Sequence, residues 1–534
     1  MGNGSTKTTA LVFPPLWDTI DAPPLGPAVL AGALRHAGLA SAFFDINLDF
    51  YGWLHADETL TELTSALSAP NSEGNVGENL EEERAQLQAL MALPESARRS
   101  SPNRVSALYA LAASLGMSAR PLLGPQRYLA GIDSSRVRMA ELTGAEPRAA
   151  VAAFWHQWMS EHIGAIAAMK PHLVAMTVSH VGQLLPAAAL AHRLRRILPQ
   201  TKFLAGGPYC TTIATSDVDV SALFTAFDAV GLGPGDEVIV SAARHPAELP
   251  RDMDGLWVRG APRPPLGKPA PTSPDYSVMP LERYCCGDQL PLIPLEASRG
   301  CWARCRYCNY VGLNRGYRTK PIEQIIAEVL DVQTRVPGAP ISFVDDTIAP
   351  KRALLLATSL ADLSVQLARR VQWEGCMRPD SGLDLEQCQS LRAGGMHRVF
   401  IGFDAATEGM LLEIDKRATL SQVRTLVRNL LAADIVVSGN FIVGLPGEVE
   451  SDRRAVLDLI EELGLNPNHV TASLFGLVRG SWYYAHIDDM GWPAEWVARV
   501  KENDVLTDFV PTPRLQAKKR LPVVRTPETG RELR

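Results

Sequence analysis

Three closely spaced cysteines are the residues of this chain with the clearest chemical potential. Cys301, Cys305 and Cys308 lie in the segment EASRGCWARCRYCNY (296–310), in a C-x3-C-x2-C spacing that a tight loop can turn toward one point. Thiolates are soft ligands that suit iron–sulfur clusters. A structural zinc site or an electron-carrying cluster normally has a fourth cysteine or histidine ligand, and no histidine lies near this segment. The spacing predicts a three-cysteine [4Fe–4S] cluster with one open iron; the alternative is a non-catalytic protein that binds a cluster or zinc.

The composition is that of a soluble globular protein of two or three domains. The chain has 534 residues, 46% hydrophobic and 21% charged, with a formal net charge of −6. This charge gives no sign of a nucleic-acid footprint, which needs a concentrated basic face. No signal peptide is visible and no apolar run reaches the roughly 18 residues that a membrane span needs. We therefore expect a cytoplasmic protein without nucleic-acid or membrane partners, in which cysteines serve metal binding or catalysis before disulfides.

The first 250 residues alternate between strand and helix patterns. TALVFPP (9–15), LGPAVLAGALRHAG (25–38) and SAFFDIN (41–47) form one β-α-β unit, and the alternation resumes after residue 170. Residues 56–170 are helix-like and are predicted to be an insertion. The pattern favours an open, Rossmann-like α/β domain over residues 1–250.

Two glycine-rich loops follow strands of this first domain. Gly206, Gly207 and Pro208 end the strand KFLAGGPY (202–209), and Gly233 and Gly235 lie in the loop of FDAVGLGPGDEVI (227–239). Ligands of open α/β sheets bind at the carboxyl ends of the strands. Glycine there lets the backbone approach a ligand closely, so these five residues are predicted to contact a cofactor.

The cysteine loop belongs to a second series of strands and helices. Residues 251–280 are rich in proline and are predicted to be a linker or wrapping segment. Residues 281–511 then contain six strand–helix units, which suit a partial (β/α)6 barrel, since a full eight-unit barrel usually takes more chain. Residues 512–534 form a short basic extension, which we expect to be a solvated tail.

The segment CWARCRYC resembles the C-x3-C-x-aromatic-C signature of the radical S-adenosylmethionine (SAM) superfamily, with Tyr307 as the aromatic residue. The resemblance implies that the open iron binds the amino and carboxylate groups of SAM. It also implies that an electron from the cluster cleaves SAM to methionine and a 5′-deoxyadenosyl radical. A flavodoxin- or ferredoxin-type protein would then be the external one-electron reductant.

Later strand ends of the second domain extend this resemblance. Asp345 and Asp346 occupy the position of the family's glycine-glycine-glutamate motif, which contacts the SAM amino group, although two aspartates replace those residues. Asp404 matches the acid that meets the SAM ribose, and GNFIVGLPGE (439–448) resembles the segment beside the adenine. The alternative for the aspartates is a capping or surface role at strand–helix junctions.

An α/β domain before the barrel is similar to the cobalamin-binding subfamily of these enzymes. The order of FPP (13–15), LAGGPY (204–209) and GLGPGDEVI (231–239) carries this similarity. The domain lacks a D-x-H-x-x-G sequence, which predicts no protein histidine on cobalt. No cysteine follows Cys388 and only Cys210 lies in the first domain, so a single cluster is expected.

The resemblance implies a cobalamin-dependent radical SAM enzyme, and we expect a C-methyltransferase acting on a natural product or peptide precursor. A cyclase, rearrangement enzyme or epimerase with the same domain pair is the first alternative. The substrate is expected to meet residues at the ends of barrel strands, for which Arg378, Tyr483 and Tyr484 are the candidates. Surface charge and core packing are the alternatives for these three side chains.

Overall fold

The structure is a computed structural model. It describes residues 8–17, 19–67, 80–98, 101, 107–108, 110–111, 157–214, 221, 223–285, 288–310, 316–501, 509–511, 524–525 and 532–533. The chain forms two compact units, and the main boundary between them falls at Pro291 and Leu292. No helix in the described ranges is both long enough and apolar enough to cross a membrane.

The first unit contains a six-stranded sheet in the order β2-β1-β3-β4-β5-β6. Strands β1 to β5 are parallel, and β6 pairs with β5 in the antiparallel direction. The strands are β1 (Thr8–Phe13), β2 (Ala40–Asp45), β3 (Leu173–Thr177), β4 (Lys202–Gly206), β5 (Ala229–Gly231) and β6 (Leu256–Val258). The chain order reverses between β1 and β3, where open α/β sheets bind their ligands.

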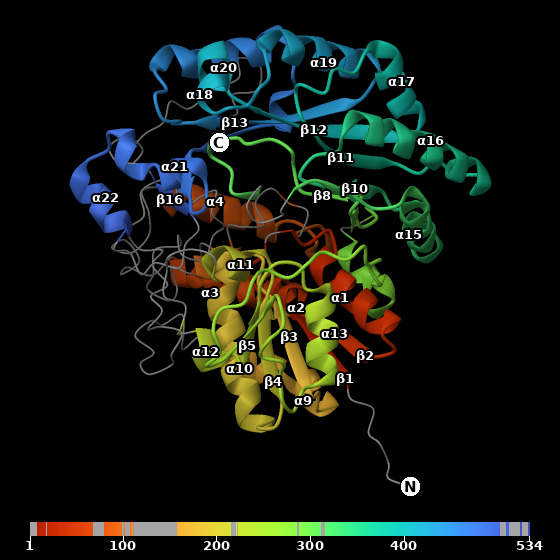
Figure 1. Ribbon diagram of the computed structural model, residues 1–534, viewed down its shortest axis with the longest axis vertical. Helices are drawn as coiled ribbons and strands as arrows, with labels where there is room; N and C mark the ends of the chain where they lie inside the picture. The colour runs from red at the N-terminus through yellow and green to blue at the C-terminus, as the bar shows by residue number, and fades with distance from the viewer. Residues whose placement is uncertain are drawn as a thin grey trace. The chain divides into compact units, whose positions relative to one another are not determined.

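Helices cover both faces of this sheet because alternate strand residues point to opposite sides (Figure 1). Ala10, Val12 and Met176 pack with helix α10, whereas Leu11 and Ala175 pack with α1 and α13. The helices are α1 (Leu25–His36), α2 (Ile46–Leu54), α3 (Asp57–Leu67), α4 (Leu80–Met91), α5 (Glu95–Arg98), α9 (Gly164–Met169), α10 (Leu184–Ile197), α11 (Pro208–Ala214), α12 (Leu223–Ala226) and α13 (Asp236–Arg244).

Two segments of this unit bear on the predicted domain limits. The expected helical insertion (56–170) contains α3, α4, α5 and α9, but residues 112–156 lie outside the described part of the chain. The proline-rich segment is not a free linker, because β6 joins the sheet and Asp275 donates its backbone N–H to Ala28 O at 2.8 Å. A Cβ on Gly32 would lie 1.9 Å from Ser273 O, so glycine in α1 allows this close packing.

The second unit contains six parallel strands in the order β14-β13-β12-β11-β10-β7. Each strand pairs with its neighbour in the series, which is the arrangement of a partial barrel, so the predicted α/β fold class is confirmed. The strands are β7 (Ile293–Leu295), β10 (Ile341–Phe343), β11 (Trp373–Met377), β12 (Met396–Asp404), β13 (Val436–Val443) and β14 (Val470–Leu474).

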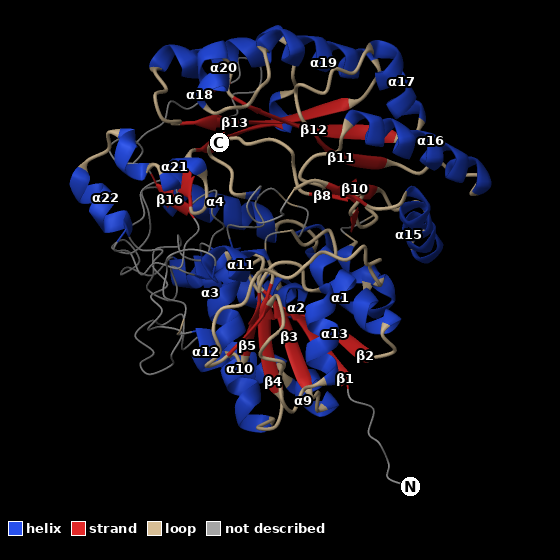
Figure 2. Cartoon of the chain, in the orientation of Figure 1, coloured by secondary structure: helices blue, strands red, loops and turns tan. Residues whose placement is uncertain are grey.

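Helices α16, α17, α19 and α20 run along one face of these strands (Figure 2). Capping boxes start α17 at Asp384 and α19 at Thr419 by satisfying free backbone N–H groups. The helices are α15 (Ile322–Arg335), α16 (Pro350–Gln366), α17 (Leu385–Ala393), α18 (Glu408–Glu413), α19 (Leu420–Ala432), α20 (Glu450–Glu462), α21 (Trp482–Ala485) and α22 (Ala494–Lys501). Strands β15 (Gly476–Val478) and β16 (Phe509–Pro511) form an antiparallel pair, as do β17 (Val524–Arg525) and β18 (Glu532–Leu533). Most of the predicted tail lies outside the described residues.

Candidate active site

The three cysteines lie on a loop at the carboxyl end of β7, the first strand of the second unit. Cys305 is buried, and Cys301 and Cys308 are half-buried. Burial and the neighbouring thiols of Cys305 and Cys301 together raise the pKa of the Cys308 thiol to about 12, although a backbone hydrogen bond from Tyr310 opposes the rise. The three sulfurs are therefore close enough to interact, and a bound metal would have to displace their protons.

This arrangement differs from the ligand shell of a single ion. Within the part of the chain that the structure describes, no three His, Cys, Asp or Glu side chains gather as the ligands of one metal ion do. A [4Fe–4S] cluster binds each cysteine through a different iron, so its three sulfurs need not converge on one point. The donor set of three thiols on one loop fits such a cluster.

Asp345 and Asp346 fasten the start of the cysteine loop. The buried Asp345 carboxylate follows β10 and accepts hydrogen bonds from the backbone N–H of Ala297 (3.0 Å) and from the N–H and hydroxyl of Ser298. Asp346 accepts from the N–H of Gly300 at 2.9 Å. Burial raises the pKa of Asp345 to about 7, although these hydrogen bonds oppose the rise. Both aspartates contact the loop, and their predicted contact with the SAM amino group stays a prediction.

A two-stranded ribbon completes the base of this loop. Strand β8 (Ser298–Arg299) pairs with β9 (Arg318–Thr319) in the antiparallel direction. The Arg299 guanidinium donates from Nε and Nη2 to the two oxygens of Glu296 at 2.6 and 2.8 Å. The backbone before Cys301 is thus held by strand pairing, an ion pair and the two aspartates.

Asp404, the residue predicted to meet the SAM ribose, ends β12 and is buried. It accepts a hydrogen bond from the Tyr307 hydroxyl at 2.6 Å and forms an ion pair with the buried Lys416. Its φ of +63° lies in the left-handed region, where a non-glycine residue is strained. Tyr307, the aromatic residue of the cysteine motif, therefore connects the cysteine loop to the end of β12.

Arg378, a predicted substrate residue, lies beside the cysteine loop. Its Nη1 is 3.9 Å from Cys305 Sγ, and its Nε and Nη2 bind Asp380 at 2.9 and 3.1 Å. Nη2 also donates to the carbonyl of Lys416. The guanidinium of Arg378 thus lies beside Cys305, and the edge formed by its Nε and Nη2 is occupied by Asp380.

The two tyrosines predicted to meet the substrate have different surroundings. Tyr483 has no exposed surface, packs against Phe475, and directs its hydroxyl to Glu413 at 3.2 Å. This burial gives Tyr483 a packing role in place of the predicted contact. Tyr484 is half-buried, and its hydroxyl accepts a hydrogen bond from Arg479, a residue that sequence reasoning missed.

At the switch point of the first unit, Gln183 joins the loops after β1 and β3. The fully buried Gln183 donates to Pro14 O at 2.7 Å and accepts from the N–H of Ser179 at 2.8 Å. Leu16, in the loop after β1, has a strained φ of +76°. The two loops where the strand order reverses are therefore locked together.

His180 follows β3 at this switch point. Its Nδ1 accepts the N–H of Gly182 at 3.1 Å, so the neutral ring carries its proton on Nε2. Nε2 is buried and has no hydrogen-bond partner among the described residues, and burial lowers the His180 pKa to about 4. The side chain thus offers an unused N–H donor, while its Nδ1 lone pair is already engaged.

The predicted glycine loops approach other parts of the backbone. Gly207 has a φ of +104°, and a Cβ there would lie 2.6 Å from Val178 O, so it brings the ends of β3 and β4 together. Pro208 is the first residue of α11. Gly233 packs near Gly267 and donates its N–H to Thr211 at 2.9 Å, and Gly235 packs against Leu30. Gly206 lies beside Gly231 in the neighbouring strand.

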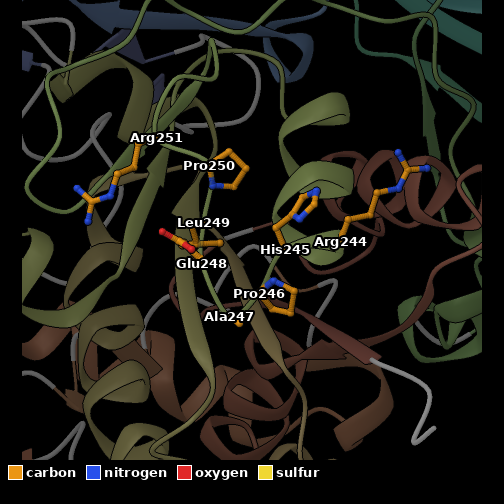
Figure 3. Close-up of a pocket in the computed structure, with 8 residues that line it drawn as sticks. All are labelled: Arg244, His245, Pro246, Ala247, Glu248, Leu249, Pro250 and Arg251. Atoms are coloured by element: carbon orange, nitrogen blue, oxygen red, sulfur yellow. The ribbon is translucent and has the colours of Figure 1, made fainter.

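A hollow of about 520 Å³ lies elsewhere on the first unit, lined by residues 244–251 (Figure 3). It begins at Arg244, the last residue of α13. A helix that follows a strand of a parallel sheet runs back toward the amino ends of the strands. This hollow is therefore at the opposite edge from His180 and Gly207, and it contains none of the predicted site residues.

A comparison with known protein families supports the domain that the cysteine loop and the series of parallel strands predicted. Residues 295–460 match the Radical SAM superfamily model. The chain therefore carries a radical SAM domain, and the prediction of a radical SAM enzyme is confirmed at the level of this domain. The matched residues include the three cysteines, Asp345, Asp346 and Asp404.

Curated relatives are similar over part of the chain. An uncharacterised methyltransferase of Pyrococcus horikoshii is 23% identical over 229 residues, which are 42% of this chain and 48% of the relative. The ribosomal protein uS12 methylthiotransferase RimO of Moorella thermoacetica is 25% identical over 186 residues, 34% of this chain and 43% of the relative. The chain spans less than half the length of these relatives.

Two solved structures are similar over most of the chain. The radical SAM methyltransferase TsrM of Kitasatospora setae, with cobalamin and a [4Fe–4S] cluster bound, has a TM-score of 0.55 and 16% identity, covering 89% of this chain and 77% of that one. The cobalamin-dependent SAM radical enzyme OxsB has a TM-score of 0.62 and 12% identity, covering 95% of this chain and 64% of that one. At these identities the likeness establishes a shared fold.

Proposed function

We propose that this protein is a cobalamin-dependent radical SAM enzyme that transfers a methyl group to a carbon atom of a natural product or peptide precursor. The observation that carries the proposal is the pairing, in one chain, of a three-cysteine loop at the first strand of a parallel sheet with an α/β domain. The fold of TsrM and OxsB spans both.

In the second unit, Cys301, Cys305 and Cys308 would hold the cluster and leave one iron open to SAM. Asp345 and Asp346 would fix the loop that presents the thiolates. Tyr307, Asp404 and Lys416 would set the distance between this loop and the end of β12. Arg378 would place a positive charge beside the Cys305 thiolate. The cluster, when present, would supply the electron that cleaves SAM, taken from a flavodoxin- or ferredoxin-type protein.

In the first unit, the carboxyl ends of β1, β3, β4 and β5 would hold cobalamin, which would carry the methyl group. The buried Nε2–H of His180 fits this group because cobalamin carries amide and phosphate oxygens that accept hydrogen bonds. Since Gly182 fixes the proton on Nε2, His180 would act as a donor and would leave cobalt without a protein histidine. Gly206, Gly207, Pro208, Gly233 and Gly235 would shape the floor of the site.

The test is reaction of the anaerobically reconstituted chain, expressed with cobalamin available, with methyl-labelled SAM. L-tryptophan, the substrate bound in a TsrM structure, is the first small molecule to try. We expect about four irons per chain, the visible spectrum of bound cobalamin, and label transfer to a carbon of an accepted substrate. The Cys301→Ala variant is the control for background labelling.

Three results would contradict parts of the proposal. A chain that takes up no cobalamin rules out this route of methyl transfer. Formation of 5′-deoxyadenosine and a changed substrate without label identifies a cyclase, rearrangement enzyme or epimerase. Zinc in place of iron would identify a non-catalytic metal-binding protein.

A further inference from the structure

Arg479 is a buried arginine with unused hydrogen-bond donors. It lies between β15 and α21, and only 3% of its surface is exposed. Its Nη1 donates to the Tyr484 hydroxyl, and its guanidinium carbon lies 5.1 Å from the centre of the Tyr484 ring. Nε and Nη2 are buried and have no hydrogen-bond partner in the part of the chain that the structure describes. This edge of the guanidinium, called the vacant edge below, therefore lacks an acceptor.

The vacant edge is the one with which other arginines of this chain bind carboxylates. In each of those ion pairs, Nε and Nη2 point to one carboxylate side by side, which is the planar fork geometry that distinguishes arginine from lysine. The pairs are Arg299–Glu296, Arg335–Asp331, Arg378–Asp380, Arg392–Asp434, Arg417–Asp415 and Arg424–Glu462. A carboxylate therefore matches the vacant edge of Arg479 in shape as well as in charge.

Arg98 is a buried arginine whose guanidinium is paired within the protein, and it serves as a comparison for Arg479. Arg98 is 4% exposed, and its guanidinium donates to Asp57 and to the carbonyls of His55, Leu93 and Met91. Arg479 has the same burial, but no carboxylate of the described residues forms an ion pair with it. A buried charge without a counter-charge is costly, so a ligand that brings one is favoured.

Arg479 belongs to a turn that contacts the cysteine loop. Asn309, the residue after Cys308, donates from Nδ2 to the Arg479 carbonyl at 3.2 Å. The next turn residue, Gly480, approaches Asn309 so closely that a Cβ on it would lie 3.6 Å from Asn309 Cβ. Tyr483 donates its N–H to Arg306 O at 3.1 Å. The vacant fork is therefore fixed to the segment that carries the cluster cysteines.

We propose that Nε and Nη2 of Arg479 bind the carboxylate of a small-molecule ligand of the radical SAM domain. The inference rests on the proposed function, because it takes the ligand from that reaction. Two sources share this chemistry: the methionyl carboxylate of SAM, and the carboxylate of the second substrate. In either case Arg479 orients the ligand beside the cysteine loop through a bidentate contact.

The experiment compares ligand pairs that differ by one carboxylate. Equilibrium dialysis of the anaerobically reconstituted holoenzyme measures binding of SAM against decarboxylated SAM, and of L-tryptophan against tryptamine. The first variant is Arg479→Met, and Arg479→Lys keeps the charge without the planar fork. The control is Arg424→Met, which removes an arginine of α19 that binds Glu462 through the same edge. We expect Arg479→Met to weaken binding of the carboxylate-bearing member of one pair tenfold or more. Its binding of the member without the carboxylate should stay at the wild-type value. Arg424→Met should bind both members of each pair as wild type does.

The responding pair identifies the source of the carboxylate. If both pairs bind Arg479→Met as they bind wild type, the proposal is overturned. Thermal unfolding without ligand provides a second reading, since removal of an uncompensated charge should leave the Tm of Arg479→Met equal to or above wild type, whereas Arg98→Met should lower it. A lower Tm with unchanged binding would make Arg479 a structural residue. Iron and cobalamin contents are measured separately, so a chain without a cluster contradicts the proposed function instead.

Discussion

The two parallel sheets of this protein present different chemistry at the carboxyl ends of their strands. In the second unit these ends carry charged side chains, namely Asp345, Asp346, Arg378 and Asp404. In the first unit the loops after β1, β3 and β4 contain a neutral set: Leu16, His180, Gln183 and Gly207. Ligands of α/β folds bind at this edge of a sheet, so the two units would present different chemical surroundings to a ligand.

The loops at the two edges are held in place in different ways. The charges of the second unit are paired with backbone N–H groups, with the Tyr307 hydroxyl or with opposite charges on Asp380 and Lys416. They fix a loop of thiols that a charged cluster and SAM would meet. The first unit uses a buried amide, Gln183, and close backbone packing at Gly207. Such a floor suits a bulky ligand that is held over a wide area.

Loss of one of the three motif cysteines should have the largest effect, and it should act on the second unit alone. We expect Cys301→Ala, Cys305→Ala and Cys308→Ala each to abolish iron binding and 5′-deoxyadenosine formation, since two thiolates cannot hold a three-cysteine cluster. Cobalamin uptake by the first unit should persist. Iron analysis and the visible spectrum measure the two separately.

Cys376→Ala is the matched control for these variants, because this half-buried cysteine lies on β11 outside the motif. Its iron content should equal that of wild type. Retained activity in any of the three motif variants would show that the cysteine loop is not the cluster site.

Removal of the Asp345 carboxylate should loosen the cysteine loop. Asp345→Ala leaves the buried backbone N–H groups of Ala297 and Ser298 without their acceptor, each costing about 1–3 kcal/mol, so a loss of about 4 kcal/mol is expected. Thermal unfolding and iron retention after gel filtration measure it. The exposed Asp362 of α16 provides the control Asp362→Ala. Equal Tm values for the two variants would contradict the anchoring role.

Gly207→Ala tests the backbone packing of the first unit. The new Cβ would overlap Val178 O in a left-handed conformation, which combines overpacking and backbone strain at about 4 kcal/mol. Cobalamin uptake should fall with Tm while the iron content stays unchanged. Gly260→Ala is the control, because Gly260 has a φ of +75° but no atom within 4 Å of an added Cβ. The two variants would behave alike if steric overlap were unimportant.

Most strands of both sheets could be predicted from the sequence, because the apolar runs end at glycine, proline or aspartate. Examples are Pro14 after β1 and Asp404 at the end of β12. The sequence also placed the cysteine loop after β7. It could not assign Tyr483, since an aromatic residue after a strand packs inward or outward according to tertiary contacts. Arg479 was missed for a related reason. Its signal is a vacant hydrogen-bonding edge, which exists only when the surrounding acceptors are known.

Asp45 places a buried carboxyl at the end of β2 in the first unit, and its replacement has the smallest expected effect. This fully buried carboxyl ends β2 and accepts hydrogen bonds from Leu48 N–H and the Tyr284 hydroxyl. Burial raises its pKa from 3.8 to about 6, more than these hydrogen bonds lower it. A raised pKa means that the folded chain holds the proton more tightly than the unfolded chain. Its stabilising contribution is full below pH 3.8 and is lost as the pH rises through 6.

Asp45→Asn removes this titration while keeping the shape of the side chain. Between pH 5 and pH 8, wild type should lose about 1.4 kcal/mol that the variant keeps, as follows from the two pKa values. The Tm of Asp45→Asn relative to wild type should therefore rise with pH over this range. A difference that is constant with pH would show that Asp45 is ionised throughout, and that the first unit tolerates a buried charge as the second does.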